Sequence, residues 1–301
     1  MLWFPLALAG YLLLAIVIIL DKLILTKSIG KPIVYTFYST IFMLGALFLW
    51  PFGVGFLQGI DWWWAVVSGL GFGFGLWTFY KAVKEGEATH IAPFNGAIIM
   101  MATYALSAWL LAEKLAAIQM AGVVILSFAS ILLTWEKSSK HKGFHFGFVW
   151  AIVSGLFFAI SHVSAKYLYE IYPFLTGFMW TRATTGLLGL FLLLFPSVRR
   201  SFTRKNREAK TVGKRHVLSI VAANKALSVG SLIFIQLAAA IGSVTLVMAL
   251  AGIQYVLIFI FVYLSTKLFP NFFHEYFTKR EITVQLIALV LVVIGSAMFV
   301  L

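Results

Sequence analysis

The sequence predicts an all-α membrane protein of ten transmembrane helices, built as two inverted five-helix repeats with both termini outside. Three observations predict it: the composition, the regular recurrence of long apolar runs, and the uneven distribution of lysine and arginine between the loops. Of the 301 residues, 62% are hydrophobic and 11% are charged, whereas soluble domains carry about 25% charged residues. A chain this apolar leaves no room for a sizeable water-soluble domain.

Ten apolar runs, separated by charges and turn residues, are each long enough to cross a bilayer core of about 30 Å. In lipid each segment must satisfy its own backbone hydrogen bonds, and the runs are too long and too uniformly apolar for barrel strands. The first run, opening with "MLWFPLALAG", has no basic region and no small-residue cleavage site, so we expect a retained span. The predicted spans are residues 2–22, 33–52, 62–82, 90–112, 116–135, 146–166, 173–195, 217–240, 243–266 and 282–301.

Basic residues collect in alternate loops and so predict the orientation of these spans, because cytoplasmic loops are enriched in lysine and arginine. The loops after the first, third, fifth, seventh and ninth spans hold nearly all of them, most densely in "RRSFTRKNREAKTVGKR" at 199–215. The opposite loops contain only Lys114 and Lys166. We therefore place the odd-numbered loops in the cytoplasm. The basic loop anchors this topology, or contacts anionic lipid headgroups.

Weak internal matches divide the chain into two halves. Residues 14–24, "LAIVIILDKLI", resemble 158–168, "FAISHVSAKYL", and "YKAVKEGEA" from Tyr80 resembles "QLAAAIGSV" from Gln236. An odd number of crossings per half reverses the second half, which is the inverted repeat typical of secondary transporters. We expect a first repeat at 1–136, a cytoplasmic linker at 137–145 and a second repeat at 146–301. Chance similarity among apolar helices is the alternative.

The segments "FYKAVKEGEATHIAPF" and "AWLLAEKLAAIQMAGVVILSFASILL" resemble the EamA-type branch of the drug/metabolite transporter superfamily. Lys279 in the second half stands where Glu113 would predict an acid, and "FPNFFHEYFT" enlarges the loop before the tenth span. The resemblance implies a central cavity lined by spans one to four and six to nine, with spans five and ten at the flanks. These signatures identify a fold rather than a cargo.

Two cations interrupt apolar spans and are the main candidates for a binding site. Arg182 and Lys225 both fall near the middle of a predicted span, where a charge costs at least about 2.5 kcal/mol unless it meets water, a partner or a ligand. All acids, Asp21 included, fall at predicted span ends or in loops, so no carboxylate is expected beside them. An anionic or carboxylate-bearing substrate would explain both cations. Bonding to carbonyls, amides or water in a polar cavity is the alternative.

Weaker candidates surround these two. His162 could carry a proton, since an unperturbed histidine titrates near 6.5, and other polar side chains could hydrogen-bond a ligand or join helices. These further candidates are Tyr38, Tyr80, Asn95, Asn224 and Gln254. The glycines of "GLGFGFGLW" lie inside an apolar span and predict close helix packing rather than a phosphate loop.

We therefore expect a secondary transporter in the cell membrane (inner or plasma membrane), which moves a small anionic or zwitterionic metabolite by alternating access. The alternatives are an exporter of hydrophobic or cationic compounds and a non-transporting membrane scaffold. The sequence has no cysteine and no HExxH or GxSxG motif, so we expect no enzymatic activity and no metal or other cofactor. The expected partners are a small-molecule substrate and the lipid bilayer, with no nucleic acid, in a monomer or homodimer.

Overall fold

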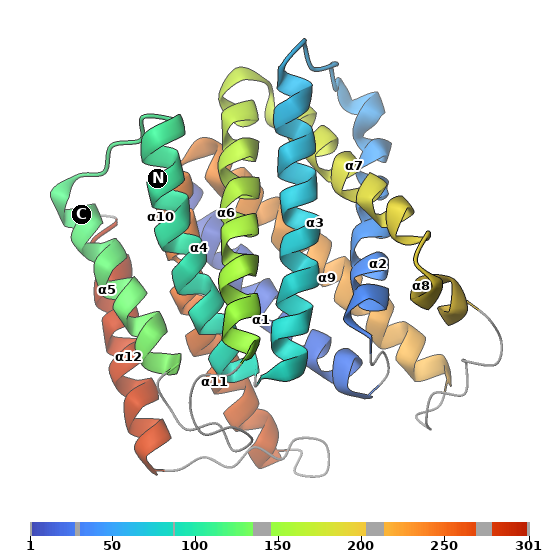
Figure 1. Cartoon of the computed structure of the whole chain (residues 1–301). Helices are drawn as coiled ribbons and strands as arrows, with labels where there is room; N and C mark the ends of the chain where they lie inside the picture. The colour runs from blue at the N-terminus through green and yellow to red at the C-terminus, as the bar shows by residue number, and fades with distance from the viewer. Residues whose placement is uncertain are drawn as a thin grey trace.

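The computed structural model describes residues 2–27, 31–86, 88–134, 146–202, 214–268 and 279–299. Throughout these ranges the regular structure is helical, in a bundle of long helices, some upright and some oblique in the view of Figure 1. The predicted linker at 137–145, most of the basic loop and the segment "FPNFFHEYFT" lie outside the described residues. The predicted all-α class is confirmed for the described part of the chain.

In the described part of the chain, each predicted apolar run is largely helical. The first half contains α1 (Trp3–Lys27), α2 (Pro32–Ile41), the 3-10 helix η1 (Phe42–Phe52), α3 (Asp61–Glu85), α4 (Ala88–Leu110) and α5 (Ala117–Thr134). The second half contains α6 (Phe146–Ile171), α7 (Phe174–Leu192), the short α8 (Pro196–Ser201), α9 (Lys214–Ile241), α10 (Val244–Ala249), α11 (Ala251–Leu268) and α12 (Lys279–Ala297).

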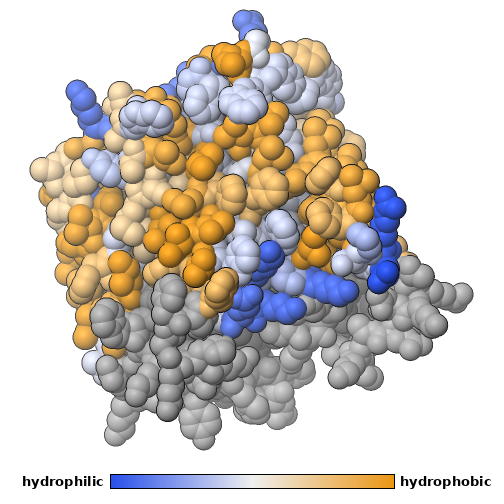
Figure 2. Space-filling model, viewed as in Figure 1, coloured by the Kyte–Doolittle hydropathy of each residue, from blue (hydrophilic) through white to orange (hydrophobic). Residues whose placement is uncertain are grey.

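Six helical segments of the described chain are long and apolar enough to cross a membrane. They are Trp3–Asp21, Pro32–Phe52, Ile91–Leu110, Phe146–Ile171, Ala223–Ile241 and Val244–Phe261. Ala117–Leu132 and Leu286–Ala297 are shorter apolar helices. Hydrophobic residues cover much of the face seen in Figure 2, as expected for a membrane protein.

Several predicted spans differ from the observed helices. The first continues past its predicted end to Lys27, so that Asp21 lies within α1 rather than at its terminus. The second changes from α to 3-10 geometry at Phe42, and the ninth is divided into two helices at Leu250. Helix α7 packs closely against the second span, since a Cβ at Gly189 of α7 would lie 2.8 Å from the backbone nitrogen of Ile41 in α2.

Two helix pairs dominate the packing, α3 against α6 and α1 against α9. The glycines of "GLGFGFGLW" explain how close α3 can come to its neighbours. A Cβ at Gly71 would lie 3.0 Å from the carbonyl oxygen of Phe157 on α6, and one at Gly69 would lie 2.6 Å from the backbone nitrogen of Thr185 on α7. The predicted role of these glycines in packing is confirmed.

Candidate substrate-binding cavity

A cavity of about 180 Å³ lies between the two halves of the chain. Its lining residues come from α1, α2, η1, α3 and α4 of the first half and from α6, α9, α10 and α11 of the second. Helices α5, α7 and α12 contribute no residue to the lining. Neither half encloses this space alone, so the site exists only where the halves meet.

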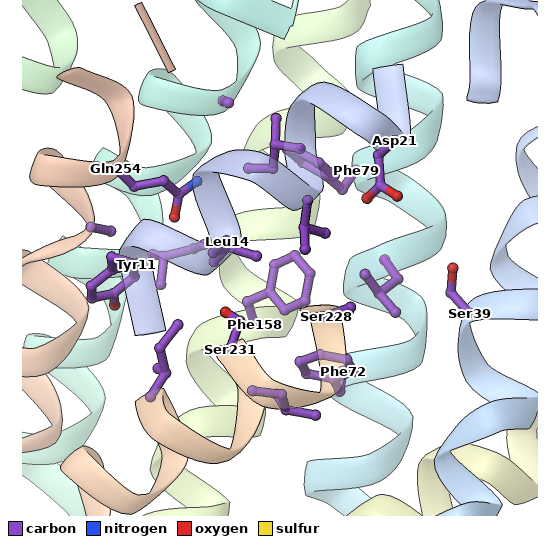
Figure 3. Close-up of a pocket in the computed structure, with 18 of the residues that line it drawn as sticks. Tyr11, Leu14, Asp21, Ser39, Phe72, Phe79, Phe158, Ser228, Ser231 and Gln254 are labelled. Atoms are coloured by element: carbon purple, nitrogen blue, oxygen red, sulfur yellow. The ribbon is translucent and has the colours of Figure 1, made fainter. Parts of the chain in front are cut away.

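Most of the wall is apolar and aromatic. Phe72 of α3 and Phe158 of α6 meet edge to face, with ring centroids 5.4 Å apart, and Phe79, Leu14 and Leu76 add further apolar surface. In the close-up, Asp21 and Ser39 lie at one side of the cavity, with Tyr11 and Gln254 at the other (Figure 3). A wall of this kind suits an organic molecule with an apolar body.

Lys225 and Ser39 lie together at one edge of the cavity. Its Nζ donates a 2.9 Å hydrogen bond to the hydroxyl oxygen of Ser39 and lies 4.6 Å from the centre of the Tyr35 ring. Ser39 and the hydroxyl of Tyr80 are 3.1 Å apart and share a further hydrogen bond. The amino group of Lys225 thus lies beside a hydroxyl and an aromatic face, which attracts cations.

Asp21 lies in the same cluster, so the prediction that the lysine has no carboxylate near it is wrong. Asp21 is only 9% exposed and lines the cavity. Its Oδ1 accepts a 2.6 Å hydrogen bond from Asn224 and a second hydrogen bond from the hydroxyl of Tyr35. Asp21 and Lys225 are close enough for electrostatic attraction. The prediction failed because α1 continues beyond Asp21, which places the carboxylate inside the bundle.

A second polar chain joins α6 to α9. The Nε2 of Gln236 and the Nδ1 of His162 are 3.1 Å apart, and the hydroxyl of Tyr169 donates to Oε1 of Gln236 over 3.0 Å. His162 and Gln236 both line the cavity. The structure therefore gives His162 a helix-joining contact while leaving it beside the cavity.

Arg182 does not line the cavity. It is 1% exposed, and the three nitrogens of its guanidinium group have no hydrogen-bond partner among the described residues. The group lies over the ring of Phe72, 4.5 Å from its centre, and 5.9 Å from that of Phe178. Because Phe72 itself lines the cavity, one aromatic ring contacts both the guanidinium group and the open space.

The structure brings together most of the predicted site residues. Lys225, His162, Asn95, Tyr80 and Gln254 line the cavity. Asn95 also donates a 2.7 Å hydrogen bond to the carbonyl of Ala151, which joins α4 to α6. That these five residues contact a substrate remains a prediction.

Two other predicted residues lie outside the lining. Asn224 adjoins the cavity through its hydrogen bond to Asp21. Tyr38 lies elsewhere, packed against Phe37 and Phe202.

Sequence reasoning missed Asp21 as a residue of the site. The signal for Asp21 was present in "IILDKLILTK", where apolar residues continue after the acid and favour continuation of the helix. The described residues contain no group of three or more His, Asp or Glu side chains that could hold a metal ion.

Glu113 connects the two halves away from the cavity. Its carboxylate accepts hydrogen bonds from Ser107 of α4, from Ser243 at the start of α10 and from Thr245, the last at 2.5 Å. Lys166 of α6 donates to the carbonyls of Ala240 and Gly242 at 3.1 and 3.0 Å, at the end of α9. These contacts hold the turn between α9 and α10 in place.

Comparison with known proteins identifies the fold alone. No family model matches the chain, and no curated protein matches it. Among solved structures 28 chains match, and one, described only as "Crystal structure of protein", superposes with a TM-score of 0.63 at 18% identity. That match covers 98% of this chain and 97% of the other. The described part of the chain therefore has a fold already known from a crystal structure.

Proposed function

We propose that this chain is a secondary transporter of the EamA type, in the drug/metabolite transporter superfamily, that moves a small anionic or zwitterionic metabolite by alternating access. The observation that carries the proposal is the cavity between the two halves, whose apolar wall has Lys225 at its edge. A lysine at such a place offers an anionic group a charge-assisted hydrogen bond. The aromatic wall adds a preference for substrates with an apolar body.

The packing supports an inverted repeat. In an inverted repeat, α1 would correspond to α6 and α3 to α9. Exchanging the two halves would then convert the contact between α3 and α6 into the contact between α9 and α1. These two contacts are the most extensive in the bundle. The α5–α12 contact converts into itself. The start of α1 and the end of α12 also lie toward the upper part of the bundle in Figure 1, as an even number of crossings requires. We propose ten spans on this basis, with both termini outside and the cell membrane as the location.

Topology can be tested without a background signal because the chain has no native cysteine. Single cysteines at Gly59 and Ser201 fall in predicted outer and cytoplasmic loops. We expect a membrane-impermeant maleimide to label the first but not the second in intact cells. The opposite pattern, or labelling of both, would show that the proposed orientation is wrong.

Transport can be tested in proteoliposomes by counterflow of labelled amino acids, nucleotides, sugar phosphates and benzenesulfonate. Loss of a hydrogen bond to a charged group is worth about 1.5–3 kcal/mol, so exchange in Lys225→Met should fall by about tenfold or more. Lys81→Met is the matched control, because Lys81 lies over the rings of Trp77 and Trp150 and does not line the cavity. Equal flux in both variants would refute a substrate contact for Lys225.

Asp21 supports a second candidate function, export of hydrophobic cations. A carboxylate that lines an aromatic cavity can also bind a cationic drug. Ethidium flux that is lost in Asp21→Asn and retained in Lys225→Met would favour this function over the first. A purified protein that moves neither class of compound would instead be the membrane scaffold considered from the sequence.

A further inference from the structure

Three charged side chains determine the charge at the empty cavity. Among the described residues, Asp21 and Lys225 are the charged side chains in the lining. Arg182 adds a third charge from behind the wall. Its guanidinium group lies over the lining ring of Phe72 and has no hydrogen-bond partner in the described part of the chain. Two cations and one carboxylate leave one positive charge, which is unfavourable inside an apolar bundle.

Asp21 is held as a carboxylate. Its Oδ1 accepts hydrogen bonds from Nδ2 of Asn224 and from the hydroxyl of Tyr35, and donors directed at a carboxyl group favour its charged form. Lys225 is close enough for electrostatic attraction. The carboxylate therefore cancels the charge of one cation and leaves the other for a ligand.

His162 of the same wall adds no charge to this balance. The hydroxyl of Tyr169 donates to Oε1 of Gln236, which turns Nε2 of that amide toward Nδ1 of His162 at 3.1 Å. An amide nitrogen can only donate, so Nδ1 accepts, and an imidazole with an accepting nitrogen is neutral. The tyrosines of the lining are neutral as well, since phenols ordinarily titrate at about 10.

We infer that the substrate is a monoanion with an apolar body, and that Asp21 sets this charge by cancelling one of the two cations. This inference rests on the proposed function and narrows it. A monoanion makes the loaded cavity neutral. A zwitterion would leave the positive charge in place, and a dianion would replace it by a negative one. Lys225 would hydrogen-bond the anionic group, while Phe72 and Phe158 would contact the body.

Arg182 acts on the ligand without touching it. Arginine keeps its charge in proteins, and the ring of Phe72 contacts both the guanidinium group and the cavity. At an effective dielectric constant of about 20, a unit charge at about 10 Å changes the affinity for another charge by about tenfold. The charge of Arg182 therefore contributes to selectivity from behind the aromatic wall.

Three benzene derivatives test this charge rule, because they share a ring and differ in charge. Benzenesulfonamide is neutral, benzenesulfonate carries one negative charge, and benzenedisulfonate carries two. Calorimetric titration of the purified full chain should give benzenesulfonate a Kd at least about tenfold lower than either of the others. Tighter or equal binding of the disulfonate would overturn this inference and leave the proposed function standing. Sulfonamide binding as tight as that of the sulfonate, or no binding at all, would count against both.

Two substitutions should shift this preference in opposite directions. Asp21→Asn leaves two positive charges, so the ratio of the Kd of the disulfonate to that of the sulfonate should fall by about tenfold. Arg182→Met leaves none, so the ratio of the Kd of the sulfonamide to that of the sulfonate should fall by a similar factor. A purely structural role would weaken all three ligands alike. Unchanged ratios in folded variants would therefore overturn the inference.

The matched controls remove the same charges away from the cavity. Asp61 bonds Tyr172 at the turn between α6 and α7, and Arg199 of α8 bonds the carbonyl of Leu193. Neither lines the cavity, so Asp61→Asn and Arg199→Met should keep the wild-type ratios. Size-exclusion chromatography verifies the folding of each variant. A shift in the controls as large as that in the test variants would also overturn the inference.

Discussion

The side-chain amide of Asn224 donates a 2.6 Å hydrogen bond to Oδ1 of Asp21, across 203 residues of sequence. This contact joins α9 to α1, and the hydroxyl of Tyr35 adds α2 by bonding the same oxygen. The charge of Lys225 lies nearby, on the residue that follows Asn224. The cluster therefore links both halves of the chain at the edge of the cavity, where any relative movement of the halves would change it.

Removing one charge of this cluster should destabilise the fold. Lys225→Met leaves the Asp21 carboxylate buried without its cation, a change worth about 3 kcal/mol in other buried pairs. We expect the double variant Asp21→Asn/Lys225→Met to recover most of that loss, because no charge is left unbalanced. Thermal unfolding in detergent gives both values. Additive losses in the double variant would show that the two residues do not interact.

Arg182 should affect transport and stability in opposite directions. Its guanidinium is buried with no hydrogen-bond partner among the described residues, so Arg182→Met should raise the free energy of unfolding by about 2 kcal/mol. Counterflow by Arg182→Met should nevertheless fall if the guanidinium binds the substrate in another conformation of the protein. The measurement pairs a melting curve with flux on one preparation. A destabilised variant would mean that the guanidinium has partners, such as water, in the folded state.

Gly69 should not tolerate a side chain. A Cβ there would lie 2.1 Å from Oγ1 of Thr184, which donates a 2.8 Å hydrogen bond to the carbonyl of Ala65. Gly69→Ala must move α3 away from α7, and overpacking of this kind costs about 1–3 kcal/mol. Gly45→Ala is the control, because nothing lies within 4 Å of the added atom. Equal melting temperatures for the two variants would contradict the close contact.

Glu113→Gln should loosen the contact between the halves. The amide keeps one acceptor oxygen but loses the charge that strengthens three hydrogen bonds, which should cost about 1–3 kcal/mol. Glu170→Gln removes a carboxylate that is 49% exposed and 3.6 Å from Lys166, and such surface pairs are worth about 0–1 kcal/mol. Hydrogen exchange at the start of α10 should rise only in the first variant. Unchanged hydrogen exchange at the start of α10 would show that Glu113 does not stabilise the contact between the halves.

The helices were predictable because each apolar run satisfies its backbone hydrogen bonds locally, whatever its neighbours are. Packing by the glycines at 69–75 was predictable for a related reason, since an apolar helix without side chains on one stripe admits a close neighbour. The change of geometry at Phe42 was not predictable, because it lies inside a continuous apolar run.

Lys225 could be recognised as a site candidate from the sequence, since a lysine in an apolar run needs a partner. Which partner it has depends on how α1 and α9 lie against each other, and Asp21 is more than 200 residues away. Arg182 illustrates the same limit. Its position in a span is local information, but its separation from the cavity by Phe72 follows from the packing of α3 on α7.

The sequence by itself determined that the chain is helical and apolar, because those properties depend on each segment and its solvent. Only the tertiary structure decided which charges meet, because a helix presents its side chains to whatever neighbour the packing supplies. In the sequence, Asp21 therefore marks the predicted end of a span. In the folded chain, it is the carboxylate that lies near Lys225.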